Sequence, residues 1–208
     1  MPSSIRIQYS LPSEEYLDRL LTDDLILRYI KDDYDRSKHR TEFYDTGDWR
    51  FTAAGYSLDL AKELTFPIIH LARGTLVPEE LPGLFHGETW TAPYDGMEGI
   101  TAALRERGAP PEFIAMAEGQ TLVKHFEIAH SSTATTLYLP DRTRILMSFD
   151  SGVLMAGGRE ERSYELSMDL LFGEESQLVN YCQQIQEQFG LSPVVLSRQQ
   201  RAQRLIAH

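Results

Sequence analysis

The sequence predicts an α+β fold built on an antiparallel sheet. Apolar and polar residues alternate over 5–10, as expected for a strand with one buried face. Over 143–170, three runs of strand-forming residues are separated by turn signals at 150–152 and at 157–158, which predicts a β-meander with two hairpins. Residues 174–189 carry apolar side chains at helical spacing and end at Gly190, which indicates an amphipathic helix.

The remaining elements follow from local signals. Ser13 is expected to cap a first helix, and Asp23-Asp24 restarts a short helical turn. Residues 30–40 are so charged that they suggest a solvent-facing connection. Further elements are expected as a strand–turn–strand unit at 43–60, a strand at 66–74, helices at 97–107 and 112–117, and one or two strands at 121–139.

Composition limits the class of protein. The 208 residues, 42% hydrophobic and 25% charged, predict a single domain over 1–208. A net charge of −11 argues against nucleic acid and anionic membranes as partners. No apolar run approaches a membrane span, no secretory signal is visible, and the lone Cys182 excludes an intrachain disulfide. A cytoplasmic protein is therefore expected.

A resemblance to a known family rests on the stretch that starts at Phe43. The spacing of Tyr44, Thr46, Asp48, Gly55 and Leu58 resembles the second-strand segment of the CYTH family, the triphosphate tunnel proteins. These include inorganic triphosphatases, thiamine triphosphatases and class IV adenylate cyclases, and the segment 77–90 resembles the inorganic triphosphatase-like members. The resemblance implies an antiparallel β-barrel closed as a tunnel, with helices packed outside.

The same resemblance implies a degenerate active site. Where the family carries Glu-x-Glu-x-Lys on its first strand, this chain has Ser4, Arg6 and Gln8. Asp59 and Gly87 stand where arginines are expected. No Arg or Lys occurs between Lys124 and Arg142, in a strand that normally reaches phosphate oxygens.

Strand alternation places Arg6, Gln8 and Asp59 on the face that lines the tunnel. The resemblance implies that Arg73, Arg198 and Arg201 lie near it, and these six residues are the candidates for contact with a ligand. For a divalent cation, the candidate ligands are Asp150, Glu165 and Asp169, which compete with a solvated or turn-capping role for the same side chains. Arg6 is expected to lie across the tunnel and to neutralise these carboxylates. Structural or exposed roles are expected for the histidines, although a transition-metal site stays open for His70, His86, His125 and His130.

Two functions from different classes follow. The first is a non-catalytic binding or scaffold protein, without a cofactor, that has lost most triphosphate- and metal-binding residues and retains room for a small polar or phosphorylated ligand. The second is an inorganic triphosphatase or phosphohydrolase that depends on Mg²⁺ or Mn²⁺, with a reduced site in which Arg198 and Arg201 hold phosphate. A third reading is an interaction module that acts through its acidic surface.

Overall fold

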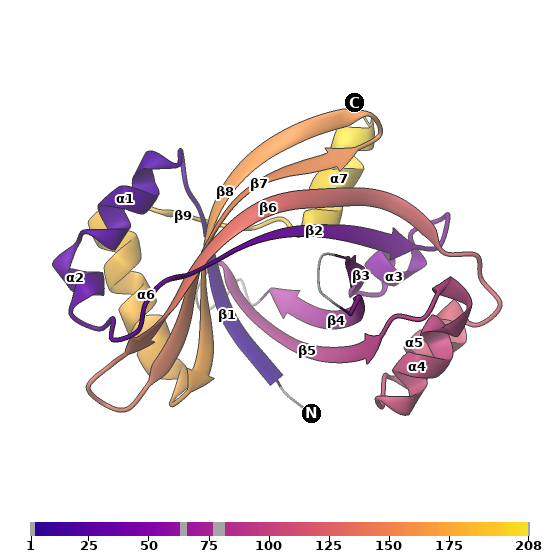
Figure 1. Cartoon of the computed structure of the whole chain (residues 1–208), viewed down its shortest axis with the longest axis horizontal. Helices are drawn as coiled ribbons and strands as arrows, with labels where there is room; N and C mark the ends of the chain where they lie inside the picture. The colour runs from indigo at the N-terminus through magenta and orange to yellow at the C-terminus, as the bar shows by residue number, and fades with distance from the viewer. Residues whose placement is uncertain (1–2, 63–65, 77–81, 208) are drawn as a thin grey trace.

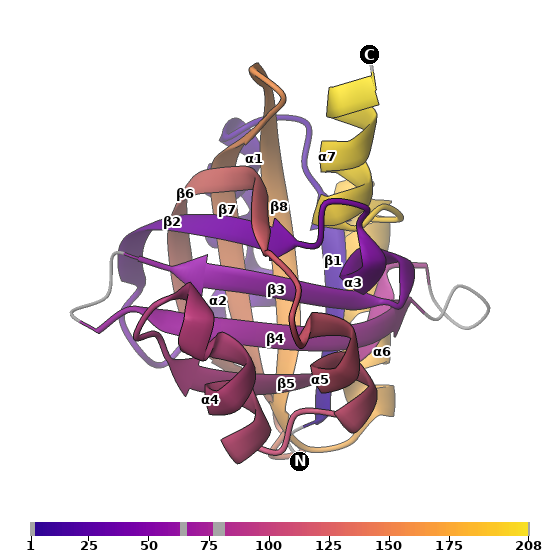
Figure 2. The ribbon, with the colours of Figure 1, turned by 90° about the vertical axis from the view of Figure 1, so that its right-hand side faces the viewer.

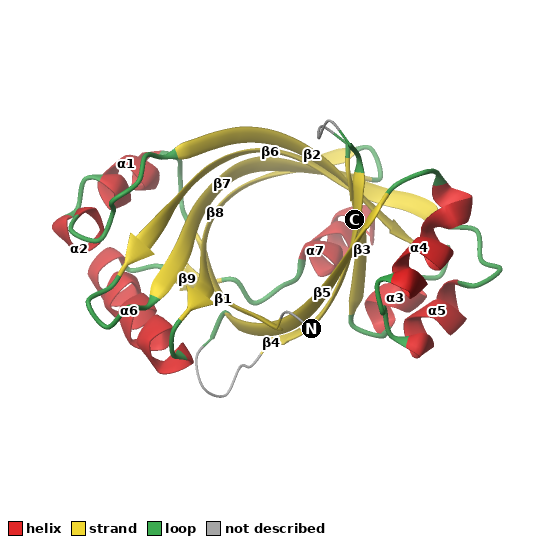
Figure 3. Ribbon diagram, turned by 60° about the horizontal axis from the view of Figure 1, so that its bottom comes forward, coloured by secondary structure: helices red, strands yellow, loops and turns green. Residues whose placement is uncertain are grey.

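The structure is a computed structural model that describes residues 3–62, 66–76 and 82–207. Its strands form one sheet in the order β5-β4-β3-β2-β6-β7-β8-β1-β9. The sheet curls into the ring shown in Figures 1 and 3. The strands are β1 (Ser3–Ser10), β2 (Asp35–Asp45), β3 (Tyr56–Ala61), β4 (Ile68–Leu76), β5 (Leu84–Pro93), β6 (Val123–Tyr138), β7 (Arg144–Ala156), β8 (Arg159–Phe172) and β9 (Ser192–Pro193).

Strand β1 closes the ring because it pairs antiparallel with β5 on one side and with β8 on the other. Arg6 is the Cα partner of Phe85 in β5 and of Asp169 in β8. The short β9 continues the β5 side of β1 at Tyr9 and Ser10. The predicted fold class, an antiparallel β-barrel closed as a tunnel, is confirmed.

One apolar layer covers the outer face of β1, β7 and β8. It contains α1 (Glu15–Leu21), α2 (Asp24–Leu27) and α6 (Glu175–Phe189), on the left of Figure 1. Leu166 and Met168 point into this layer with at most 1% of their surface exposed, as predicted. Gly190 ends α6 in the left-handed conformation, also as predicted. This layer fixes which face of β8 remains for the tunnel.

A second apolar layer covers β3, β4 and β5 (Figure 2). It is formed by α3 (Arg50–Ala53), α4 (Ile100–Glu106) with the preceding 3₁₀ turn η1 (Met97–Gly99), and α5 (Pro111–Ala117). Asp45, at the end of β2, accepts hydrogen bonds from the backbone N–H groups of Phe51 and Thr52, each at 2.9 Å, which positions α3. No helix in the described ranges is both long and apolar enough to span a bilayer.

The last helix, α7 (Arg198–Ala207), packs against the inner face of the barrel instead of outside it. Its Ala202 is fully buried in a cluster with Phe43, Phe126 and Leu154, which share the inner face of the strands. Figure 3 looks into the ring and shows α7 within the outline of the strands. The helices predicted outside the barrel are present as α1 to α6, whereas α7 was not predicted from the sequence and lies on the inner face.

Three local predictions are wrong. Residues 35–40 belong to β2 and not to a connection, because both faces of this half-strand are polar and hide the alternation. The first helix begins after Glu14, and Ser13 is not its N-cap. The turn predicted at 150–152 does not form, since β7 runs without interruption from Arg144 to Ala156.

The continuous β7 changes the predicted pairing of the meander. Residues 153–156 pair with 162–159, while Tyr164–Leu170 pairs with 151–145. Gly152 does not form a turn but allows β7 to approach β6 closely, since a Cβ on this residue would lie 2.9 Å from the Cβ of His130. Only Gly157-Gly158, with both φ angles positive, makes the predicted hairpin. Residues 77–81 of the segment 77–90 lie outside the described residues.

Candidate functional site

The inner faces of β1 and β8 place their polar side chains in pairs. The Nε of Arg6 donates to Oδ1 of Asp169 at 2.6 Å, and the Nε2 of Gln8 donates to Oγ of Ser167 at 3.0 Å. Each pair joins Cα partners of neighbouring strands. Arg6 therefore lies on the tunnel wall and neutralises its neighbour Asp169. The expectation that it also reaches across the tunnel to Asp150 and Glu165 is wrong.

The carboxylates of Asp150 and Glu165 are neutralised by α7. An Nη2 of Arg198 lies 3.8 Å from Oδ2 of Asp150 and 3.7 Å from Oε2 of Glu165. Arg201 donates from Nε to Oε1 of Glu161 at 2.8 Å, and from Nη1 to Oε1 of Glu165. Two arginines one helical turn apart thus engage three carboxylates on β7 and β8.

Glu165 is the centre of this network. Its side chain is 8% exposed, and that of Arg201 is 14% exposed. Burial acts to raise the pKa of Glu165, but the guanidinium groups of Arg198 and Arg201 outweigh it and hold the pKa below its usual range. Glu165 is therefore ionised at neutral pH, and its charge is compensated within the chain.

Asp59 is the inner-face carboxylate with the weakest compensation. It lies on β3 opposite Phe43 on β2 and His70 on β4. Burial raises its pKa to about 7, against a smaller opposing effect of Arg198. Burial also lowers the pKa of His70. Burial therefore favours the protonated, neutral form of Asp59.

Two histidines face each other on β2 and β6. The rings of His39 and His130 lie 5.3 Å apart, and Nε2 of His39 lies 2.6 Å from Oγ of Ser37. Burial lowers the pKa of His130, while the carboxylate of Asp150 acts to raise it. Nδ1 of His130 is buried without a hydrogen-bond partner in the described structure. The pair adds polar groups to the tunnel wall.

Arg73 does not line the tunnel. Its Nη1 donates to Oε1 of Glu112 on α5 at 3.1 Å, and its guanidinium lies over the ring of Tyr56. Both partners belong to the outer layer around α5. The prediction that Arg73 lines the tunnel is wrong because the odd-numbered residues of β4 face the outer layer in the observed register.

The ring of Phe85 covers Gly87, the residue at which the sequence resemblance leads to the expectation of an arginine. A Cβ on Gly87 would lie 2.3 Å from Cε1 of Phe85, and a Cβ on Gly74 would lie 1.7 Å from Cζ of the same ring. The ring of Phe85 therefore lies against both glycines, which are Cα partners on β4 and β5. A basic side chain at residue 87 would require this ring to move.

A divalent cation, which the fold family implies, does not fit the carboxylates as they are arranged. Asp150 and Glu165 are Cα partners on β7 and β8, but their oxygens face Arg198 and Arg201. Asp169 is bound separately by Arg6. Within the described ranges, no three His, Cys, Asp or Glu side chains form a group that could hold a metal ion. Guanidinium groups occupy the place of the cation, so the three candidate ligands do not act together.

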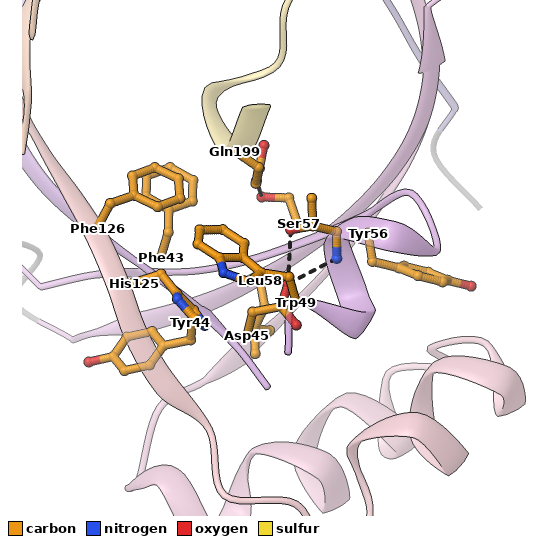
Figure 4. A pocket seen from close by; sticks show the side chains of 11 residues that line it. Phe43, Tyr44, Asp45, Trp49, Tyr56, Ser57, Leu58, His125, Phe126 and Gln199 are labelled. Atoms are coloured by element: carbon orange, nitrogen blue, oxygen red, sulfur yellow. Dashed lines mark hydrogen bonds between the residues drawn. The ribbon is translucent and has the colours of Figure 1, made fainter. Parts of the chain in front are cut away.

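A small aromatic pocket lies beside the first turn of α7 (Figure 4). Phe43 and Phe126 stack with ring centroids 4.3 Å apart, and Trp49 lies 3.9 Å from His125. Gln199 of α7 reaches into this pocket and donates to Oγ of Ser57. The free volume is about 10 Å³, enough for roughly one water molecule.

Two residues of the site were missed from the sequence. Glu161 was not selected because the third strand of the meander was started at Tyr164, whereas β8 begins at Arg159. Continuing the alternation back from Glu165 by two steps would have found it. Gln199 was missed although its neighbours Arg198 and Arg201 were selected, because the tail was not predicted to be a helix.

The fold is that of the tunnel barrels, and solved structures support it. No family model and no curated relative matches the chain by sequence. A protein from Hippeastrum, described as a candidate adenylyl cyclase with a dominant triphosphatase activity, has a TM-score of 0.58 and 14% identity, over 93% of this chain and 92% of that chain. A protein from Pyrococcus horikoshii OT3 has a TM-score of 0.53 and 9% identity, over 97% and 98% of the two chains. A candidate adenylate cyclase from Bacillus halodurans has a TM-score of 0.51 and 16% identity, over 95% and 96%.

Proposed function

We propose that this chain is a non-catalytic binding protein with a tunnel-barrel fold that no longer holds a triphosphate. The observation that supports this most is the pairing of Arg6, Arg198 and Arg201 with carboxylates on the tunnel wall. Phosphoryl transfer needs cations that are free to hold the phosphate oxygens as charge develops. Here these cations already neutralise the protein's own carboxylates.

The balance of charge on the inner face points the same way. Four carboxylates are paired with three arginines, and these carboxylates are Asp150, Glu161, Glu165 and Asp169. A triphosphate would have to displace them from Arg6, Arg198 and Arg201, which would leave buried negative charges facing further negative charge. An uncompensated buried charge costs several kcal/mol. A neutral or cationic polar group is therefore the better occupant.

The test is release of inorganic phosphate from tripolyphosphate, ATP and thiamine triphosphate in the presence of Mg²⁺ or Mn²⁺. The wild-type chain is expected to release no more than the double variant Arg198→Ala/Glu165→Gln, which serves as the matched control. Metal-dependent release by the wild type that this double variant abolishes would contradict the proposal.

A second candidate is a phosphohydrolase with a reduced site, the activity described for the Hippeastrum neighbour. One observation favours it. Arg198 lies 3.7–3.8 Å from its two carboxylates and is 32% exposed, so it is less firmly held than Arg201. Such an arginine can turn toward a phosphate. Activity lost in Arg198→Ala but retained in Arg6→Ala would assign the function to this second class.

A further inference from the structure

The feature that carries a further inference is the way α7 is held. In the described structure its contacts with the barrel are made by side chains, because its backbone hydrogen bonds stay within the helix and its first turn. The last strand-like contact before it is Val194 N to Gln8 O at 2.9 Å. Val195, in the connection that follows, is 63% exposed. Leaving the tunnel would therefore break no pairing between strands.

The ionic half of the contact recognises arginine specifically. Arg201 uses Nε and Nη1 to bind two carboxylates, those of Glu161 and Glu165, at once. Lysine carries a single ammonium on a flexible stem and does not reproduce this two-pronged geometry. Arg198, one turn earlier, adds its charge to Asp150 and Glu165.

The apolar half requires a small residue directly after the second arginine. Ala202 is fully buried against Phe43, Phe126 and Leu154, and Leu205 packs on the same cluster. A larger side chain at 202 would overpack this contact. The bound element is thus a helix with the pattern Arg-x-x-Arg-Ala-x-x-Leu, in which the intervening positions 199, 200, 203 and 204 are polar and Ile206 is 44% exposed.

We propose that the inner face formed by Asp150, Glu161, Glu165, Phe43 and Phe126 is a docking site for a basic amphipathic helix of a partner protein. The chain's own α7 fills this site and shows the chemistry it selects. A partner helix with two arginines one turn apart, followed by alanine and leucine, would exchange with α7. This deepens the proposed binding function, but its test is independent of the phosphate-release assay, so the two can fail separately.

The first measurement uses the wild-type full-length chain and hydrogen exchange. Amides of α7 are expected to exchange at least about tenfold faster than those of β7, because the helix opens without unfolding the barrel. If α7 amides exchange only at the rate of global unfolding, the helix is an integral part of the fold and the proposal is overturned.

The second measurement is binding of a fluorescent peptide with the sequence Leu196–Ala207, followed by anisotropy. The full-length chain Arg198→Gln/Arg201→Gln retains the docking site but weakens its own α7. It is expected to bind the peptide at least about tenfold tighter than the wild-type chain. The matched control is a peptide with both arginines changed to glutamine, which the double variant should not bind more tightly than the wild-type chain does. Adding Glu165→Gln to the double variant should likewise abolish the tighter binding of the original peptide.

Equal binding of both peptides, or no binding by a variant that keeps the far-UV circular dichroism of the wild type, would overturn the proposal. Should the double variant not fold, the full-length Arg201→Lys chain is measured with the same two peptides and the same outcomes apply. If the wild-type chain forms a dimer and the peptide dissociates it, the proposal of a different partner protein is also overturned. The helix in the docking site would then be α7 of a second copy of this chain.

Discussion

The contact between Arg201 and Glu165 gives the sharpest stability prediction, and the perturbation is Arg201→Gln. The variant keeps part of the side-chain stem but removes the charge, which leaves Glu165, 8% exposed, with only the more distant Arg198. Breaking a buried ion pair by removing one partner costs about 3–5 kcal/mol. Since Arg198 remains, we expect the free energy of unfolding to fall by about 3 kcal/mol, the lower end of that range.

The assay is a double-mutant cycle by urea unfolding at pH 7, followed by circular dichroism. Glu165→Gln should be milder, because Arg201 keeps Glu161 as a partner. The double variant should recover part of the loss, with a coupling energy of about 1–3 kcal/mol. Additive single effects would refute the reasoning. The exposed pair of Arg105 with Glu118 is the matched control, for which a coupling near zero is expected.

The coupling should also depend on pH. The pKa of Glu165 is lowered in the folded chain, so its contribution to stability is present above its unfolded pKa of 4.5 and is lost as pH falls through the folded pKa. The cycle repeated in that acidic range should give a smaller coupling energy. An unchanged coupling would mean that Glu165 interacts with Arg201 as a neutral hydrogen-bond partner.

Two further predictions concern Asp59 and the register of β8. Burial raises the pKa of Asp59 from 3.8 to about 7, so the unfolded chain releases this proton first and stability falls as pH rises between these values. The wild type should therefore lose at most about 4 kcal/mol of unfolding free energy between pH 4 and pH 8 through this group, and Asp59→Asn should not show this loss. If the free energy of unfolding depends on pH in the same way in both chains, the prediction is wrong. For β8, Leu166→Ala should cost about 2–5 kcal/mol, because Leu166 is buried in the outer layer. Ser167→Ala should cost only about 1 kcal/mol, for one hydrogen bond from Gln8, and similar losses at both positions would place the register in doubt.

The sequence predicts the barrel wall well where the two faces of a strand differ. Ile7 and Tyr9 alternate with Arg6 and Gln8 in β1, and the structure buries the first pair outside and turns the second pair inward. In β2, both faces of the first half are polar, so no alternation marks residues 35–40 as a strand. Alternation reports a difference between faces, and it fails when both faces meet polar surroundings.

The site was predicted in its parts but not in its connections. Alternation places Asp59 and Glu165 on the inner face, yet it cannot say which cation meets which carboxylate. Asp150-Ser151-Gly152 has the composition of a turn, but Gly152 is needed for the close approach of His130 within a long strand. The position of α7 depends on contacts between residues more than 30 apart in sequence, such as Arg201 with Glu165, and no local pattern encodes these.

The most direct test of the central claim, that the tunnel's arginines are already neutralised by its own carboxylates, is isothermal titration calorimetry of the wild-type chain with tripolyphosphate, with and without Mg²⁺. The account predicts no binding tighter than about 1 mM in either condition, because Arg198 and Arg201 remain with Glu161 and Glu165. Micromolar binding that Arg198→Ala or Arg201→Ala abolishes would contradict it, since it would show that these arginines leave their carboxylates for phosphate.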